Sequence, residues 1–196
     1  VGDDPCDIEK IMLKLRNVAR IATRPWIIEN ACWDIIGKKA NMPVYKILGA
    51  ARDRIPVYAA WGELRSNEQR YDDAQRLVDM GFRAVKIRFS HEKTKDDIAI
   101  AGGEINIGIP DFKLMLDKGC FDILQPNCTM STGISYIRKI AALADSYGKI
   151  VNPHAYIPGM GVLQSMHLVA SYTNFTWLEY PCDPPSLTPE VFQGVL

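Results

Sequence analysis

Two positively charged side chains alternate with apolar ones in the segment Ala84-Val85-Lys86-Ile87-Arg88-Phe89. If this segment is a strand, Lys86 and Arg88 point to the same face, because side chains alternate along a strand. Two cations on the inner face of a sheet are costly unless anions or a ligand compensate them, and a neighbouring cation favours the neutral form in which lysine acts as a base. The segment therefore predicts either acid–base chemistry on an anionic ligand or an edge strand with a solvated charged face.

Polar residues follow several apolar segments that are typical of buried strands. Glu104 comes after Ala101-Gly102-Gly103, whose glycines allow a tight exit from a strand, and later segments end in Asn127, His154 and Glu179. In α/β proteins the functional site lies at the carboxyl ends of the strands. A single carboxylate there is commonly a helix cap or a surface group, and a single histidine is commonly structural. Several polar residues at one rim of one sheet nevertheless favour a shared site.

The elements that must position these residues alternate between strand and helix from Arg54 onward. Segments rich in β-branched and aromatic residues predict strands, and apolar residues at helical spacing predict the helices between them. This repeated succession indicates a parallel sheet with right-handed crossovers. We predict strands at 55–60, 84–89, 98–103, 121–125, 149–153 and 176–180, and helices at 67–80, 111–118, 135–147 and 160–171.

The first fifty residues are predicted to be helical instead. Residues 8–20 have apolar side chains at helical spacing, with Asp7 in the N-cap position. Residues 26–39 are apolar over most of the helix circumference, which is typical of a helix buried against a larger body. A short turn at 44–48 ends at Gly49.

The predicted strands are too unevenly spaced for a complete barrel. The second and third start at residues 84 and 98, only 14 residues apart. A strand–helix–strand unit typically takes ~30 residues, and its crossover alone takes at least a dozen or so. Either the third strand is not a parallel neighbour of the second, or whole strand–helix units are absent between them. Six strands, where a closed (β/α) barrel has eight, favour absent units.

Composition and charge restrict the function classes. The 23 Lys and Arg residues balance 23 Asp and Glu residues, so the chain has no net charge to attract nucleic acid or an anionic membrane surface. With 47% hydrophobic and 23% charged residues the chain is globular, and its apolar runs are shorter than the ~18 residues of a membrane span. The five cysteines form no Cys-x-x-Cys pair and are typical of reduced thiols. We expect a cytoplasmic protein that binds neither nucleic acid nor membranes.

Several segments, in this order, resemble the mandelate racemase and muconate lactonizing branch of the enolase superfamily. Residues 28–38 (IENACWDIIGK) and 43–49 (PVYKILG) resemble the helices that join the capping domain of this family to its barrel. Residues 81–88 (GFRAVKIR) resemble the second barrel strand with its Lys-x-Lys or Lys-x-Arg motif, and 101–104 (AGGE) resembles the end of the fifth. The positions that correspond to the ends of strands six, seven and eight are Asn127, His154 and Glu179.

This resemblance implies an enzyme that removes the proton α to a carboxylate, with Mg²⁺ stabilising the enediolate. Glu104 would be a metal ligand, Lys86 and Arg88 the strand-two pair, and His154 the acid or base, while Glu179 would face the substrate carboxylate. The leading function is dehydration of a sugar acid to a 2-keto-3-deoxy acid by a lyase. The alternatives are a cycloisomerase, epimerase or racemase of the same superfamily, or a non-catalytic enolase-like protein. The family also implies a homo-oligomer.

The chain departs from the family pattern at three points. Arg88 stands where the family usually has a lysine base; it stays protonated, which disfavours a two-base racemase. Asn127 stands where an Asp commonly pairs with the histidine; it can orient an imidazole but brings no charge to stabilise the protonated ring. The metal carboxylates of strands three and four have no counterpart, and one carboxylate does not retain Mg²⁺ against water.

These departures and the strand spacing lead to one hypothesis. We expect an α/β fold in which residues 1–53 are the C-terminal helical part of an α+β capping domain. Residues 54–196 would form a partial TIM-type (β/α) barrel that lacks strands three and four, with a gap in the sequence near residues 99/100.

Overall fold

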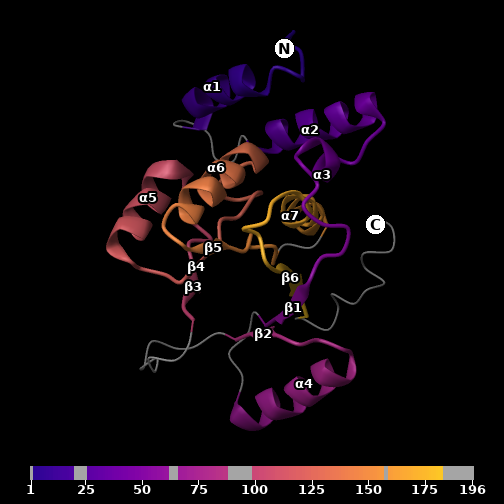
Figure 1. Cartoon of the computed structure of the whole chain (residues 1–196), viewed down its shortest axis with the longest axis vertical. Coiled ribbons are helices and arrows are strands. Elements are labelled where there is room, and N and C mark those ends of the chain that lie inside the picture. Colours follow the sequence, from indigo (N-terminus) through magenta and orange to yellow (C-terminus); the bar gives the residue numbers. More distant parts are fainter. Residues whose placement is uncertain (1, 20–25, 62–65, 88–98, 157–158, 183–196) are drawn as a thin grey trace.

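The fold is an alternation of strands and helices preceded by a helical layer (Figure 1). The computed structural model describes residues 2–19, 26–61, 66–87, 99–156 and 159–182. Nearly every predicted element is present, although most strands are shorter than predicted. The helices are α1 (Ile8–Ala19), α2 (Trp26–Ala40), α3 (Val44–Ile47), α4 (Asn67–Asp79), α5 (Gly108–Lys118), α6 (Ile134–Asp145) and α7 (Met160–Ser171). The strands are β1 (Val57–Ala60), β2 (Val85–Lys86), β3 (Ala101–Gly102), β4 (Ile123–Leu124), β5 (Ile150–Val151) and β6 (Leu178–Pro181).

The six strands form two three-stranded parallel sheets, in the orders β2-β1-β6 and β3-β4-β5. A parallel bridge between Val151 and Phe175 connects β5 to the segment that leads into β6. The strands therefore follow one arc in the order β2-β1-β6-β5-β4-β3. In the described part of the chain, β2 and β3 each pair with one neighbour and form the two ends of this arc. This is an incomplete (β/α) barrel, which confirms the predicted fold class.

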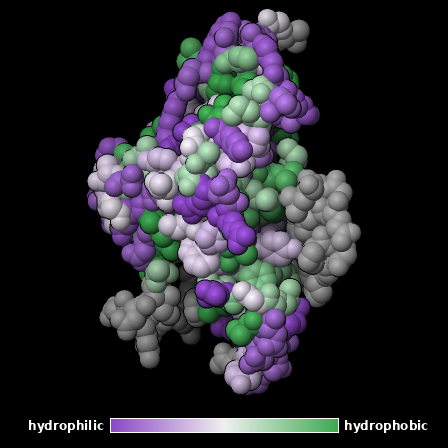
Figure 2. All heavy atoms as spheres, turned by 45° about the vertical axis from the view of Figure 1, so that its right-hand side comes forward, coloured by the Kyte–Doolittle hydropathy of each residue, from purple (hydrophilic) through white to green (hydrophobic). Residues whose placement is uncertain are grey.

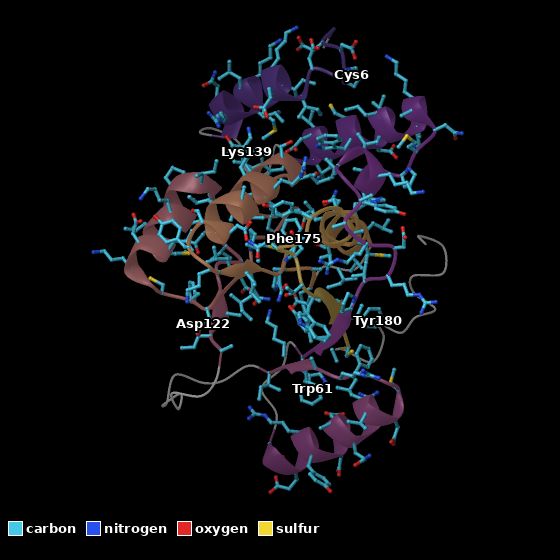
Figure 3. The ribbon with its side chains drawn as sticks, viewed as in Figure 1. Cys6, Trp61, Asp122, Lys139, Phe175 and Tyr180 are labelled. Carbon is cyan, nitrogen blue, oxygen red and sulfur yellow. The ribbon has the colours of Figure 1, made fainter. Side chains whose placement is uncertain are left out.

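The core lies between the β3-β4-β5 sheet and the helices that cover it. Phe112 of α5, Ile137 and Ile140 of α6 and Leu168 of α7 are fully buried in one cluster with Phe175. Figure 3 shows Phe175 at the centre of the molecule, between the strands and these helices. The strand–helix periodicity thus places the apolar face of each helix on the sheet.

Helices α1 and α2 lie on α6 rather than on the strands (Figure 1). Ile8, Ile11, Met12 and Leu15 of α1 form a small core with Trp26 of α2 and Tyr136 of α6. The aromatic rings of Trp26 and Tyr136 meet edge to face, with centroids 5.6 Å apart.

Helix α2 packs against the rest of the molecule, as predicted, but part of its apolar circumference is exposed. Ile27, Ile28 and Ile35 are 69%, 50% and 45% exposed. The buried residues of α2 include the polar pair Glu29 and Asn30, which face the barrel. Hydropathy alone did not predict which face of α2 is buried, because the inward contacts of Glu29 and Asn30 are hydrogen bonds.

The outer surface mixes polar and apolar side chains. Figure 2 shows hydrophilic residues over much of one face, with apolar patches among them near the top, where α1 and α2 lie. No helix in the described part of the chain is long and apolar enough to cross a membrane.

Candidate active site

A partly buried ion pair joins β2 to β6. The ammonium Nζ of Lys86 donates a hydrogen bond to Oε1 of Glu179 at 2.8 Å, and the Glu179 side chain is only 1% exposed. β1 lies between these strands, with Ala60 opposite Lys86 and Tyr58 opposite Glu179. Since neighbouring strands are about 4.8 Å apart, the long lysine side chain must pass the small side chain of Ala60 to reach the carboxylate. The charge of Lys86 is therefore compensated inside the barrel.

The second oxygen of Glu179 connects this pair to the end of β5. Its Oε2 accepts a hydrogen bond from the backbone N–H of Ala155 at 2.8 Å and lies 3.7 Å from Nε2 of His154. A buried carboxylate is tolerated when each oxygen has a donor, and both oxygens of Glu179 have one. Glu179 is thus held in one orientation beside the imidazole.

His154 lies between Glu104 and Asn127. Its Nε2 is 2.8 Å from Oε2 of Glu104, and its Nδ1 is 3.0 Å from Nδ2 of Asn127. The imidazole is nearly buried, with 8% of its side chain exposed, whereas the Glu104 side chain is 39% exposed. The ring therefore has one polar partner on each nitrogen, and its Nε2 side is the more open one.

The hydrogen bonds of Asn127 determine which nitrogen of His154 carries the proton. Oδ1 of Asn127 accepts from the N–H and hydroxyl of Thr129 and from the N–H of Met130, at 2.8–2.9 Å. This orients the amide so that its NH₂ group faces Nδ1 of His154. An amide N–H can only donate, so Nδ1 is the acceptor and the proton of the neutral ring is on Nε2. His154 therefore presents an N–H donor to Glu104 and to the space beside it.

Glu104 reaches this site because the chain turns sharply after β3. Gly103 has φ 110°, a conformation that residues with a side chain rarely adopt, and an added Cβ would lie 2.8 Å from the ring of Phe112. Glycine at this position lets β3 pack on α5 and directs the next residue to the rim. The sequence pattern correctly predicted this turn.

Two further polar residues lie on the inner side of the barrel and were not predicted as site residues. Nε2 of Gln125 donates to the phenol oxygen of Tyr58 at 2.9 Å, and both residues are buried. Burial, with the charge of Glu179 adding to it, raises the pKa of Tyr58, so the phenol stays neutral. Tyr58 could have been found from the alternation of β1, which places it on the same face as Ala60.

Two other residues near the site are unsuited to chemistry. Trp61 packs against Ala59 and Leu77, and Figure 3 shows it on the side of β1 that faces α4. Cys128 follows Asn127 directly, but burial raises the pKa of its thiol to about 12. A thiol with that pKa is not a nucleophile at neutral pH.

The structure brings together five of the six residues predicted for the site. Hydrogen bonds and ion pairs connect Lys86, Glu104, Asn127, His154 and Glu179. Arg88, the sixth, lies outside the described residues.

The described residues do not fit a magnesium ion. Mg²⁺ requires near-octahedral oxygen coordination, usually from carboxylates together with water. No group of three His, Cys, Asp or Glu side chains that could hold a metal occurs in the part of the chain that the structure describes. Glu104 instead faces His154, and both oxygens of Glu179 have hydrogen-bond donors.

Comparison with known proteins identifies the family. Residues 93–196, more than half of the chain, match the family model described as enolase C-terminal domain-like. This chain belongs to the enolase superfamily. The resemblance noted in the sequence is thereby confirmed.

Relatives in the enolase superfamily include enzymes with different reactions. Arabinonate dehydratase of Saccharolobus solfataricus is 21% identical, and the match covers 85% of this chain and 62% of that protein. D-galactarolactone cycloisomerase of Agrobacterium fabrum is 25% identical, with coverage of 88% and 66%. The crystal structure of a racemase from Streptomyces coelicolor with bound magnesium has a TM-score of 0.77 at 21% identity, and the match covers 92% of this chain and 74% of that one. This last likeness shows the fold alone.

The chain is shorter than these curated relatives, and part of the difference is internal. It spans less than two thirds of the length of the arabinonate dehydratase and of the cycloisomerase. The alignment with the dehydratase extends over 234 residues but uses 85% of the 196-residue chain, which is about 167 residues. Within the aligned region, about 67 residues of the dehydratase therefore have no counterpart in this chain.

Proposed function

We propose that this chain belongs to an enzyme that removes the proton α to the carboxylate of a sugar acid and then eliminates the β-hydroxyl group as water. The observation that carries the proposal is the orientation of His154, whose Nε2–H faces the more open side of the site. An N–H donor held in that position suits stabilisation of a departing hydroxyl by a hydrogen bond. The similarity to a sugar acid dehydratase supports the same reaction class.

The roles of the other residues follow from their contacts. The ammonium of Lys86 first releases a proton to water, and the resulting amine accepts the Cα proton: the C–H bond breaks and an N–H bond forms. Glu179, 2.8 Å from Nζ, stabilises the resulting ammonium. The C–O bond to the β-hydroxyl then breaks while Nε2–H of His154 donates a hydrogen bond to the departing oxygen. The proton that Lys86 took from Cα goes to that oxygen, which leaves as water.

We further propose that the complete enzyme contains strand–helix units that are absent from this chain near residues 99/100. Two facts support this placement: the paired residues leave β2 and β3 at the two ends of the arc, and the dehydratase has about 67 aligned residues without a counterpart. That length is close to two strand–helix units of ~30 residues each. In this proposal residues 1–53 end a capping domain and residues 54–196 form the partial barrel.

Mg²⁺ is the cofactor we propose for the complete enzyme, with Glu104 as one ligand and the others supplied by the absent units. Isothermal titration calorimetry separates this from a non-catalytic protein. We expect no heat of Mg²⁺ binding with the 196-residue chain. We expect binding once the corresponding dehydratase segment is inserted between Ala99 and Ile100. Absence of binding in the completed chain would support a non-catalytic relative.

The reaction itself is tested by incubating the completed chain with a panel of aldonates and aldarates in D₂O and recording NMR spectra of the products. We expect a 2-keto-3-deoxy acid, and we expect its formation to be lost with His154→Gln. Deuterium at Cα without loss of water would instead indicate an epimerase or racemase. Ring closure or opening of a lactone would indicate a cycloisomerase, which the similarity to D-galactarolactone cycloisomerase makes the second candidate.

A further inference from the structure

Helix α6 begins without a cap from its own sequence. Its N-cap residue is Gly133, which has no side chain to accept a hydrogen bond. The N–H of Ser135, in the first turn, donates instead to Oε1 of Glu29 at 2.7 Å. Glu29 belongs to α2 and is fully buried. A carboxylate from the N-terminal helices thus takes the place that a Ser, Thr, Asp or Asn usually has at a helix start.

Residue 133 must be a glycine because Glu29 occupies the space where a side chain would lie. Its backbone is extended, with φ −96° and ψ 176°, which residues with side chains adopt readily. A Cβ at this position would overlap with Oε2 of Glu29. The glycine is therefore required by the carboxylate and not by the backbone conformation.

The neighbouring residue of α2 holds the other end of the same loop. Nδ2 of Asn30 donates to the carbonyl of Cys128 at 3.4 Å, and Nε1 of Trp33 donates to Oε1 of Glu29 at 3.1 Å. The loop between these anchors starts at Asn127 and folds back onto it, because the N–H groups of Ser131 and Thr132 both donate to the Asn127 carbonyl. Helix α2 is therefore hydrogen-bonded to both ends of the loop that orients Asn127, through Asn30 at one end and Glu29 at the other.

We propose that Glu29 is a positioning residue for the active site. By capping α6 from another helix it holds the 127–135 loop in place, and the loop holds the Asn127 amide that keeps the proton of His154 on Nε2. The inference rests on the proposed role of His154, but both of its tests are independent of turnover.

The first test is a double-mutant cycle between Glu29→Ala and Gly133→Ser in the 196-residue chain, followed by thermal unfolding. In the parent chain, Gly133→Ser should lower the melting temperature, because the new Cβ overlaps with Glu29. In the Glu29→Ala background the same change should raise it by roughly 2–8 °C, because serine can then cap α6 itself. Equal shifts in both backgrounds would mean that the two positions do not interact, and would overturn the proposal.

The second test uses the NMR signals of the His154 ring to report whether the 127–135 loop keeps its conformation. Ring nitrogens of ¹⁵N-labelled protein are observed by NMR, and His154 is distinguished from His91 and His167 with a His154→Gln variant. We expect the signature of the Nε2–H form in the parent chain and in Glu29→Gln, which keeps an oxygen for the Ser135 N–H. We expect it to be lost or averaged with Glu29→Ala.

The matched control is Glu9→Ala. Glu9 also connects an N-terminal helix to α6, through Lys139 at 2.8 Å, but its side chain is 74% exposed. Its removal should leave the His154 signals unchanged. If Glu29→Ala does not fold, Glu29→Asp withdraws the carboxylate by one methylene and serves instead. Unchanged His154 signals in a folded Glu29 variant with a weakened cap would show that Glu29 stabilises without positioning, and would overturn the proposal.

Discussion

At the scale of single residues, the ion pair between Lys86 and Glu179 is both a catalytic candidate and a structural element. Removing one partner of a buried pair leaves the other charge without compensation, which costs far more than the pair itself contributes. The pair lies in the interior, with Lys86 23% and Glu179 1% exposed. The molecule should therefore tolerate loss of both charges better than loss of one.

We predict that Lys86→Met lowers the free energy of unfolding by about 3 kcal/mol, because Glu179 is then buried beside an apolar side chain. Urea unfolding of the single variant and of Lys86→Met combined with Glu179→Leu measures this. The double variant should recover a large part of the loss. A double variant that is less stable than Lys86→Met would show that the carboxylate does not depend on the lysine.

The amide of Asn127 makes a separate prediction about the position of the proton. Asn127→Asp replaces the NH₂ group that faces Nδ1 of His154 with an oxygen, which accepts a hydrogen bond. Nδ1 should then carry a proton, and the ¹⁵N NMR signature of the ring protonated on Nε2 alone should disappear. An unchanged spectrum would contradict the assignment. Asn127→Ala removes the partner altogether and serves as the control.

At the scale of elements, α2 and α6 are coupled by a carboxylate whose proton affinity differs between the folded and unfolded states. Burial raises the pKa of Glu29 above its ordinary value of 4.5, and the hydrogen bonds from Ser135 and Trp33 offset part of this effect. A group with a raised folded-state pKa contributes its full stabilisation below the unfolded pKa. It loses this contribution as the pH rises through the folded pKa.

We therefore predict that Glu29→Gln gains stability relative to the parent chain as the pH is raised from 4 to 8. The neutral amide keeps an acceptor for Ser135 and has no charge to bury. Melting temperatures of both proteins across this range give the difference, and the curve of the variant records the pH dependence of all other groups. A difference in melting temperature that stays constant with pH would show that burial does not raise the pKa of Glu29.

The elements could be predicted from sequence, whereas some of their contacts could not. Apolar periodicity located the helices closely, and the position of a polar residue after a strand placed Glu104, Asn127 and His154 at one rim. Glu179, predicted to end its strand, lies inside β6. The extent of the strands was overestimated, because a local pattern cannot show where pairing stops. The burial of Glu29 could not be predicted, because its reason is the start of a helix more than 100 residues away.

The orientation of the Asn127 amide also could not be predicted from the sequence pattern. It depends on the turn at Thr129 and Met130, whose donors lie within three residues but point toward Oδ1 only in the folded loop. The resemblance to the family pattern predicted that an amide stands in place of the usual carboxylate. Only the geometry shows which ring nitrogen carries the proton as a result.

At the scale of the whole molecule, the arc of six strands predicts unequal protection along the sheet. The inner strands β1 and β4 are paired on both sides, whereas the described pairing leaves β2 and β3 with one neighbour each. Val85, Ile87 and Ile100 beside these outer strands are 37–41% exposed. Backbone groups at the ends of the arc should therefore open more easily than those inside it.

We predict that amide hydrogens of peptides covering β2 and β3 exchange at least tenfold faster than those covering β1 and β4. Hydrogen–deuterium exchange with mass spectrometry measures this. Insertion of the dehydratase segment between Ala99 and Ile100 should slow exchange at β2 and β3 and leave β1 and β4 unchanged. Equal protection of all four strands in the 196-residue chain would mean that another part of the chain covers both ends.

The two ends of the arc differ in how readily they can pair with a strand of another molecule. An outer strand is a template for edge-to-edge association unless charge or bulk opposes it. At β2 the inward-pointing charge of Lys86 opposes such association, so a residue of the candidate site also protects this end of the arc. At β3, Ala101 and Gly102 bring neither charge nor bulk. Self-association of the concentrated chain should therefore start at β3, and a single lysine at position 101 should suppress it.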